Sequence, residues 1–362
     1  MNLLALTSWN ECLNMKTWLL TGNEKLELRE VPVPSPGADQ VLVKVKAASI
    51  CNRTDLVAFL YNENPVEFFG YKLPSPDDFG YEWVVRSPLY LDHFGHEITG
   101  IVEKVGKDVK RISVNDRVFL RSPIRSTTYS GFSEYVLAWE YATAQLPANL
   151  TFEEGVLGEL LPIAIGAARH IKTGDYVGIL GQGPGGLMIT QVARIQGAAK
   201  IIVADKYEKR LKLAKELGAD CTVNVTKENI EEKVKDLIGA KDLEGDGLDV
   251  VIDAVGTPDV LRECVRLVRK GGTVSIFGTH HLEPVIIDLV KWEEKVITVT
   301  MSNEASKEEI EERLEKARSL LAAGVIKTKP FITHVLKLAE LPQAFILLKD
   351  SPGEVVKIVL TP

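Results

Sequence analysis

The chain has 362 residues, which is more than one ordinary hydrophobic core holds and suits two domains. Its 45% hydrophobic and 26% charged residues are typical of folded globular proteins, and its net charge of −7, with basic residues scattered among acidic ones, argues against a nucleic-acid partner. No membrane helix is expected either, because the most apolar stretch, 155–168, is short and carries Glu159 in its middle.

The N-terminal residues 1–14 lack the basic start and small-residue cleavage site of a secretory signal. The four cysteines, Cys12, Cys51, Cys221 and Cys264, lie far apart, so their spacing indicates neither a disulfide framework nor a C-x-x-C metal pair. We therefore expect a reducing, cytoplasmic location. Met15 is a second candidate, beside Met1, for the natural start.

Residues 16–141 contain short β-rich runs between turn signals. The runs are 41–45, 98–105, 116–120 and 132–137. This pattern predicts a mainly antiparallel β domain.

From about 162 to 300, apolar β-branched runs alternate with helical patterns. The runs are 176–180, 201–204, 250–254, 273–277 and 296–300. Such alternation predicts an α/β domain with a doubly wound parallel sheet. The remaining chain offers a charged helical pattern at 306–323 and strand-like runs at 331–335 and 355–360.

A glycine-rich turn joins the run 176–180 to a helical pattern. It reads Gly181-Gln182-Gly183-Pro184-Gly185-Gly186, which has the G-x-G-x-x-G spacing of a dinucleotide-binding turn. Gly181 would allow the tight turn, Gly183 the approach of a pyrophosphate, and Gly186 close packing of helix and strand. Alone the motif is weak, because glycine-rich turns also open helices in methyltransferases.

Asp205 strengthens this interpretation because it ends the next strand-like run, 201–204. An acid there would bind the ribose hydroxyls of NAD and repel the extra phosphate of NADP. The alternative is an aspartate that caps a turn. Lys206, Lys209 and Arg210 would soften the preference, so NAD is expected and NADP is kept as an alternative.

Several fragments together resemble the zinc-dependent medium-chain dehydrogenases/reductases, in matching order from about Met15 to the C-terminus. They are Cys51-Asn52-Arg53-Thr54-Asp55, Gly95-His96-Glu97, Gly131-Phe132-Ser133-Glu134-Tyr135, residues 152–159, the glycine turn, residues 215–220 and residues 271–274. The resemblance implies a mainly β GroES-like catalytic domain over 1–161, to which 305–362 returns, and a Rossmann domain over 162–304. It also implies a cofactor site, with candidates Gly181, Gly183, Pro184, Gly185, Gly186, Asp205, Arg210, Val255, Gly256, Phe277 and Gly278.

By this resemblance, Cys51, His96 and Glu159 are the protein ligands of a catalytic zinc with one open position. A thiolate, an imidazole and a carboxylate suit Zn²⁺, which would act as a Lewis acid on an alcohol oxygen. Glu97 is expected beside the zinc or in place of its water, as a further candidate ligand. Taken singly, each residue has a structural alternative, such as a core cysteine or a surface histidine.

Two further residues complete the expected catalytic set. Asp55 would accept the second ring proton of His96 and fix its orientation; otherwise it is an ordinary helix cap. Most relatives begin the proton relay with Ser or Thr two residues after the cysteine ligand, but Arg53 occupies that position here. Thr54 is therefore the expected relay residue.

The chain departs from the family in two places. The four-cysteine lobe of many relatives, which binds a structural zinc, is replaced by a short connection at 121–130, so one zinc per subunit and no structural metal are expected. An insertion at 56–92 is rich in aromatic residues, namely Tyr61, Phe68, Phe69, Tyr71, Phe79, Tyr81, Trp83 and Tyr90. It is a lid or pocket wall, a dimer contact, or a satellite cluster under a long loop.

Glutamate as third ligand resembles the sorbitol, threonine and sugar dehydrogenase branches, so the expected substrate is a secondary alcohol or polyol. A homodimer or homotetramer is expected, because the resembled family pairs through the edge of the cofactor-domain sheet. Two alternatives stay open: a zinc-free quinone or enone reductase of the same superfamily, and a cofactor-binding structural protein without turnover.

Overall fold

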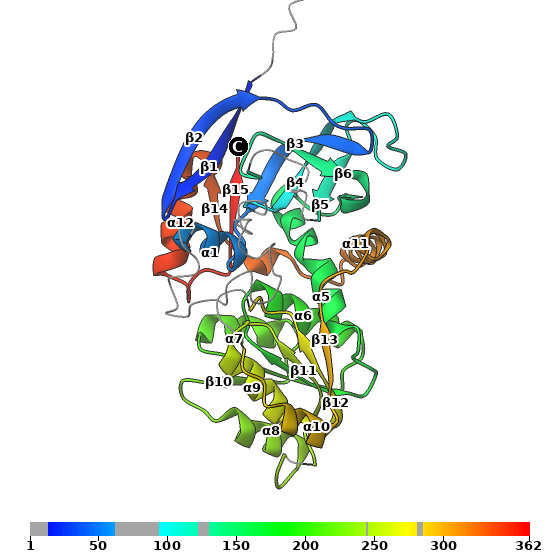
Figure 1. Cartoon of the computed structure of the whole chain (residues 1–362), viewed down its shortest axis with the longest axis vertical. Helices are drawn as coiled ribbons and strands as arrows, with labels where there is room; N and C mark the ends of the chain where they lie inside the picture. Colours follow the sequence, from blue (N-terminus) through cyan, green and yellow to red (C-terminus); the bar gives the residue numbers. More distant parts are fainter. Residues whose placement is uncertain (1–13, 62–93, 122–129, 244, 281–284) are drawn as a thin grey trace, which may run out of the picture.

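The computed structural model describes residues 14–61, 94–121, 130–243, 245–280 and 285–362. Figure 1 shows two halves, a β-rich one at the top that also contains the C-terminus and an α/β one below. None of the helices in the described part of the chain is both long and apolar enough to cross a membrane.

The α/β half is built on a six-stranded parallel sheet in the order β10-β9-β8-β11-β12-β13. Its strands are β8 (Tyr176–Leu180), β9 (Lys200–Asp205), β10 (Cys221–Asn224), β11 (Leu248–Asp253), β12 (Val268–Ile276) and β13 (Thr298–Met301). Its helices are α6 (Pro184–Ile195), α7 (Glu208–Glu216), α8 (Ile230–Ile238), α9 (Pro258–Leu267) and α10 (Leu289–Lys295). The strand order reverses between β8 and β11, where the carboxyl ends of the strands open a crevice.

The β-rich half contains a sheet in the order β14-β15-β3-β4-β5-β7, with β6 paired to β3, and a separate pair, β1 and β2. Its strands are β1 (Asn14–Gly22), β2 (Lys25–Pro32), β3 (Gln40–Ser49), β4 (Glu97–Val105), β5 (Arg117–Leu120), β6 (Tyr135–Trp139), β7 (Thr143–Gln145), β14 (Ile332–Lys337) and β15 (Lys357–Thr361). The C-terminal strand β15 pairs antiparallel with β3. The domain limits 1–161 with 305–362, and 162–304, stay a prediction.

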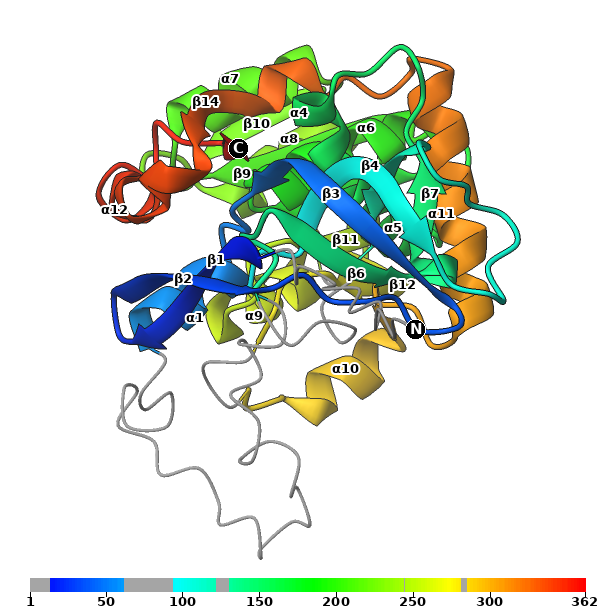
Figure 2. The ribbon, with the colours of Figure 1, turned by 90° about the horizontal axis from the view of Figure 1, so that it is seen from above.

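The remaining helices and short 3-10 turns lie between strands of the β-rich half or between the two sheets. They are α1 (Thr54–Tyr61), η3 (Glu140–Ala142), α4 (Phe152–Gly155), η4 (Val156–Gly158), α5 (Leu160–Ala168), α11 (Lys307–Ala322), η5 (Lys329–Phe331), η6 (Leu338–Glu340) and α12 (Leu341–Asp350). Helix α11 packs against α5 and η3 beside β7 (Figure 2). One buried apolar cluster joins Phe119 of β5, Leu161 of α5 and Val177 of β8, so the hydrophobic core continues across the junction.

The expected fold class is confirmed, a Rossmann-type parallel sheet joined to a GroES-like β domain. Several strands begin later than predicted, among them β6, which begins at Tyr135 rather than 132, and β13. Val296 has a φ of 51° at the end of α10, so the run 296–300 forms a strand only from Thr298. Strands β1, β2, β7 and β10 were not expected. Most residues of β2 are exposed, so its sequence lacks the alternation of a half-buried strand.

Candidate functional site

A cleft of about 1330 Å³ lies between the two sheets. Its walls include Cys51, His96 and Glu159 from the β-rich side and Gly183 and Asp205 from the parallel sheet. The predicted metal ligands and most of the predicted cofactor residues therefore line one cavity, although the sequence separates them widely; Gly186, Gly256 and Gly278 do not line it.

The register of two antiparallel strands brings Cys51 beside His96. Ser49, the last residue of β3, is paired with Glu97, the first residue of β4. Cys51 comes two residues after Ser49, beyond the end of β3, and His96 comes directly before Glu97, at the start of β4. As a result, the ligand atoms of Cys51, His96 and Glu97 lie within 4.8 Å of one another.

Asp55 anchors the loop that carries Cys51. Its carboxylate accepts the backbone N–H of Cys51 at 2.8 Å and that of Gly95 at 2.9 Å, and it lies 3.7 Å from Nδ1 of His96. Burial raises the pKa of Asp55 to about 6, although His96 and the two amides lower it. Asp55 thus faces the imidazole at 3.7 Å, which is longer than a hydrogen bond, and its predicted role as acceptor of the ring proton stays a prediction.

The carboxylate of Glu97 forms an ion pair with Lys357 of β15. Lys357 Nζ lies 2.6 Å from a carboxylate oxygen of Glu97 and donates to the carbonyl of Ile50 at 3.0 Å. Ser49 also donates to Glu97 through a short hydrogen bond. Lys357 and Glu97 are both almost fully buried, so each requires the other as a counter-charge.

Glu159, the other predicted carboxylate ligand, is paired with Arg121. Arg121 Nη1 lies 2.6 Å from Oε1 of Glu159, and Nη2 lies 2.9 Å from Oε2 of Glu304. In this arrangement the structure therefore groups Glu97, rather than Glu159, with the cysteine and the histidine. Whether Glu159 is a metal ligand stays a prediction.

The charges around His96 fit a bound cation. Burial alone would lower the pKa of His96, but Cys51, Asp55 and Glu159 raise it well above its usual value. A region that favours the charged imidazole so strongly would also favour a divalent ion. Sulfur, nitrogen and carboxylate donors at this spacing match the preferences of Zn²⁺.

The glycine turn has the steric properties that a dinucleotide requires. Gly181 has a φ of 98°, which favours glycine. A Cβ on Gly186 would lie 1.9 Å from the carbonyl oxygen of Gly181, so helix and strand pack too closely for a side chain. At Gly183 the nearest atom to such a Cβ is Arg210 Nη1 at 4.0 Å, which leaves open space at the N-terminus of α6.

Pro184 and Gly185 form the first turn of α6. Pro184 is compatible with this position because the first amides of a helix have no partner within the helix. A Cβ on Gly185 would lie 2.2 Å from Cε1 of Phe277, so the first helical turn packs against the end of β12.

Asp205 and Arg210 border the turn. Asp205 accepts the backbone N–H of Gln182 at 2.7 Å and that of Tyr207 at 2.9 Å, so it caps the turn after β9, as the alternative had it, and also supports the glycine turn. Its contact with the ribose hydroxyls stays a prediction. Arg210 stacks against the ring of Tyr207, with its Cζ 4.8 Å from the ring centroid, and donates to the carbonyl of Pro352 at 2.6 Å. One nitrogen of the Arg210 guanidinium is therefore already bound to a backbone carbonyl.

The ends of β11 and β12 complete the cofactor side of the cleft. Asp253 accepts the backbone N–H groups of Val255 and Gly256, both at 2.9 Å, and lies 2.7 Å from Nε2 of His280. A Cβ on Gly278 would lie 2.1 Å from the amide nitrogen of Gly256, so the two loops touch through their backbones.

Thr54 and Arg53 lie between the halves. Thr54 begins α1 and lines the cleft, consistent with the predicted relay role, which stays a prediction. Arg53 donates to the carbonyls of Gly256 at 3.4 Å and Thr279 at 3.0 Å, and thus links the loop after Cys51 to the cofactor side.

Sequence reasoning missed Lys357, Arg121 and Glu304 as functional residues. A signal existed for Lys357, because it is a lone lysine inside the apolar run 355–360. Arg121 and Glu304 carried none, since their pairing spans 183 positions of the chain. The predicted insertion 56–92 lies mostly outside the described residues, as do 122–129 of the connection that lacks the cysteine lobe.

Two family models match the chain, an alcohol dehydrogenase GroES-like domain over residues 37–148 and a zinc-binding dehydrogenase over residues 184–322. Human sorbitol dehydrogenase is 27% identical, with 96% of each chain covered. L-threonine 3-dehydrogenase of Bacillus subtilis is 29% identical, with 92% of this chain and 94% of that protein covered.

Solved structures agree with these matches. An alcohol dehydrogenase from Escherichia coli CFT073, complexed with NADH, has a TM-score of 0.77 and 25% identity over 96% of this chain and 99% of that one. A zinc-binding dehydrogenase from Sinorhizobium meliloti 1021, bound to NADP, has a TM-score of 0.75 and 26% identity over 97% of this chain and 100% of that one. The chain belongs to the zinc-dependent alcohol and polyol dehydrogenases of the medium-chain dehydrogenase/reductase superfamily.

Proposed function

We propose that this protein transfers a hydride between a secondary alcohol or polyol and NAD(P). The observation that carries the proposal is the placement of Cys51, His96 and Glu97 in the same cleft as the glycine turn. Hydride transfer requires the carbinol carbon and the nicotinamide to meet, and one shared cleft supplies that requirement.

Cys51 and His96, together with a carboxylate, would hold one zinc ion. When bound, the ion would supply Lewis acidity toward the substrate oxygen, and the nicotinamide would accept the hydride. The pairing of Glu97 with Lys357 leaves its carboxylate beside the cysteine and histidine, which supports Glu97 as a ligand. A single zinc per chain, with no structural zinc, is part of the proposal.

Two neighbouring residues would support the chemistry. Asp55 would hold the His96 ring in place, because its carboxylate faces Nδ1. Thr54 would pass the hydroxyl proton of the substrate toward solvent, since it lines the cleft at the start of α1.

NAD is the proposed cofactor, with Asp205 as the residue that disfavours NADP. Asp205→Asn removes the negative charge and keeps one oxygen for the backbone amides of the turn. We expect the ratio of kcat/KM with NAD to that with NADP to fall by at least about tenfold, equivalent to about 1.4 kcal/mol.

Steady-state kinetics with both cofactors check this result. Asp220→Asn is a matched control, because Asp220 pairs with Arg194 and does not line the cleft. It should leave the ratio unchanged. A wild-type preference for NADP of tenfold or more would contradict the proposal.

A panel of alcohols, polyols, sugars and hydroxy amino acids tests the reaction itself. NAD(P) reduction with at least one secondary alcohol or polyol, lost after chelation and restored by zinc, is the expected result. Tight NAD binding without turnover on any member would instead indicate a cofactor-binding protein. Activity kept after chelation would indicate a zinc-free reductase.

A homodimer through the edge of the parallel sheet is also proposed. β13 is the last strand of that sheet among the described residues, and large apolar side chains gather on and before it. They are Ile286, Leu289, Val290, Val296 and Met301, each at least 58% exposed. Such a group beside an open strand edge is typical of a two-fold interface.

Val290→Lys is expected to shift the protein toward the monomer, because it places a charge within that apolar group. Light scattering after size exclusion measures the mass. Ile346→Lys is the control, since Ile346 is 42% exposed on α12, in the other half of the molecule. If the wild type is a monomer at micromolar concentration, the proposed interface is wrong.

A further inference from the structure

Arg121 joins the two sheets at the metal side of the cleft. It follows β5 of the β-rich half, whereas its partner Glu304 follows β13 of the parallel sheet. Its guanidinium binds Glu304 along one edge, with Nε at 3.4 Å and Nη2 at 2.9 Å, and Glu159 through Nη1 at 2.6 Å. One cation therefore lies between two carboxylates.

The three side chains are removed from water. The exposed fractions are 13% for Arg121, 2% for Glu159 and 3% for Glu304. A buried carboxylate needs a counter-charge, and among the described residues Arg121 forms the ion pair with Glu159. The position of Glu159 thus depends on where the guanidinium is held.

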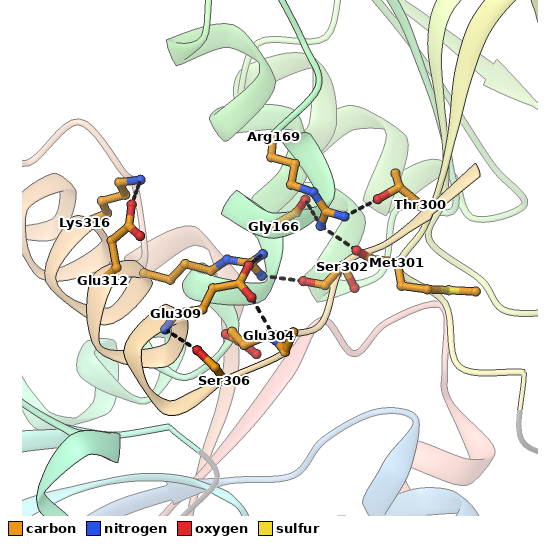
Figure 3. A network of polar contacts seen from close by, with 12 residues as sticks. Gly166, Arg169, Thr300, Met301, Ser302, Glu304, Ser306, Glu309, Glu312 and Lys316 are labelled. Carbon is orange, nitrogen blue, oxygen red and sulfur yellow. Dashed lines mark hydrogen bonds and ion pairs between the residues drawn. The ribbon is translucent and has the colours of Figure 1, made fainter. Parts of the chain in front are cut away.

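The segment that carries Glu304 is itself fixed, as Figure 3 shows. Arg169 donates to the carbonyl of Met301 at 2.5 Å and to the hydroxyl of Thr300, and Arg313 donates to the carbonyl of Ser302 at 2.5 Å. Glu304 therefore projects from an anchored connection between β13 and α11. Such a support can set the plane of the Arg121 guanidinium.

We infer that Arg121 is a positioning residue that keeps Glu159 beside the metal site but out of direct coordination, and that Glu304 orients Arg121. The inference rests on the proposed function, since it requires a metal ion at Cys51 and His96. Without Arg121, the buried Glu159 would have the metal ion as its nearest counter-charge. The carboxylate would then bind the ion and compete with the substrate for the open position.

Arg121→Met tests this, because methionine keeps much of the side-chain volume and removes the charge. With cobalt(II) in place of zinc, the visible spectrum of the variant should shift, since the Glu159 carboxylate would replace water or substrate at the open position. Competition with a chelator should show metal binding at least tenfold tighter. Turnover should fall, and Arg121→Lys should restore part of the wild-type spectrum.

Arg117→Met is the matched control. Arg117 begins the same strand, donates to the carbonyl of Leu150 at 2.6 Å and stacks on Phe152, but does not contact Glu159. It should lower the melting temperature and leave the cobalt spectrum unchanged. If Arg121→Met does not fold, Glu304→Ala carries the test, because it frees one edge of the guanidinium and should shift the spectrum in the same direction by less.

The outcomes distinguish a failure of the proposed function from a failure of the role of Arg121. If the wild type binds neither cobalt nor zinc, the proposed function fails. If it binds metal, and Arg121→Met or Glu304→Ala gives the wild-type spectrum and metal affinity, only the role of Arg121 is overturned.

Discussion

Replacing Cys51 with serine is expected to remove metal binding and activity together. The thiolate is the softest donor of the cluster, and serine offers a weakly acidic hydroxyl in its place. Loss of a group that merely orients a ligand already costs about 10–100-fold in affinity or activity, so loss of the ligand should lower kcat/KM by more than about 100-fold. Metal analysis and NAD reduction on the same sample measure both effects.

Cys221→Ser is the control for this prediction. Cys221 begins β10, does not line the cleft, and has a pKa raised by burial, so its thiol is a structural group. That variant should keep metal and activity. A Cys51→Ser protein that retains turnover would show that the reaction does not use the metal site.

Substitutions at two glycines of the turn should separate cofactor binding from stability. Gly183→Val places a side chain in open space, where the nearest atom to a Cβ is 4.0 Å away, so the fold should persist. The valine would occupy the space that the pyrophosphate needs, and NAD binding should weaken by at least about tenfold, or 1.4 kcal/mol.

Gly186→Val should have the opposite pattern. Its Cβ would lie 1.9 Å from the carbonyl oxygen of Gly181, so strand and helix must separate. Overpacking of this kind costs about 1–3 kcal/mol or more, and the melting temperature should fall by several degrees. Thermal unfolding and NAD titration on both variants measure the contrast. Equal loss of stability in both would contradict the assignment of the space at Gly183 to a ligand.

Local patterns identified the central strands of the parallel sheet, β8, β9 and β11, because these strands are buried on both faces. The run 176–180 is apolar without interruption and forms β8 with the same limits. The same reasoning placed the start of a strand at Val296, and this was wrong. Val296 is apolar, but it ends α10 in a left-handed conformation. A composition rule cannot detect that backbone geometry.

The candidate site was only partly predictable from the sequence, because some of its ion pairs join residues that are far apart in the chain. Cys51 and His96 were found from their motifs, and the pairing of Ser49 with Glu97 brings them together. The choice between Glu97 and Glu159 depends on cations far away in sequence, since Lys357 lies 260 positions from Glu97. Such pairings follow from tertiary packing, and no local spacing encodes them.

The metal content of each chain, measured on protein purified without chelator, tests the central claim most directly. One zinc per chain, removed by chelation together with NAD reduction and restored by added zinc, is the predicted result. Protein without zinc that still reduces NAD would contradict the zinc-dependent mechanism, and two zinc ions per chain would contradict the absence of a structural site.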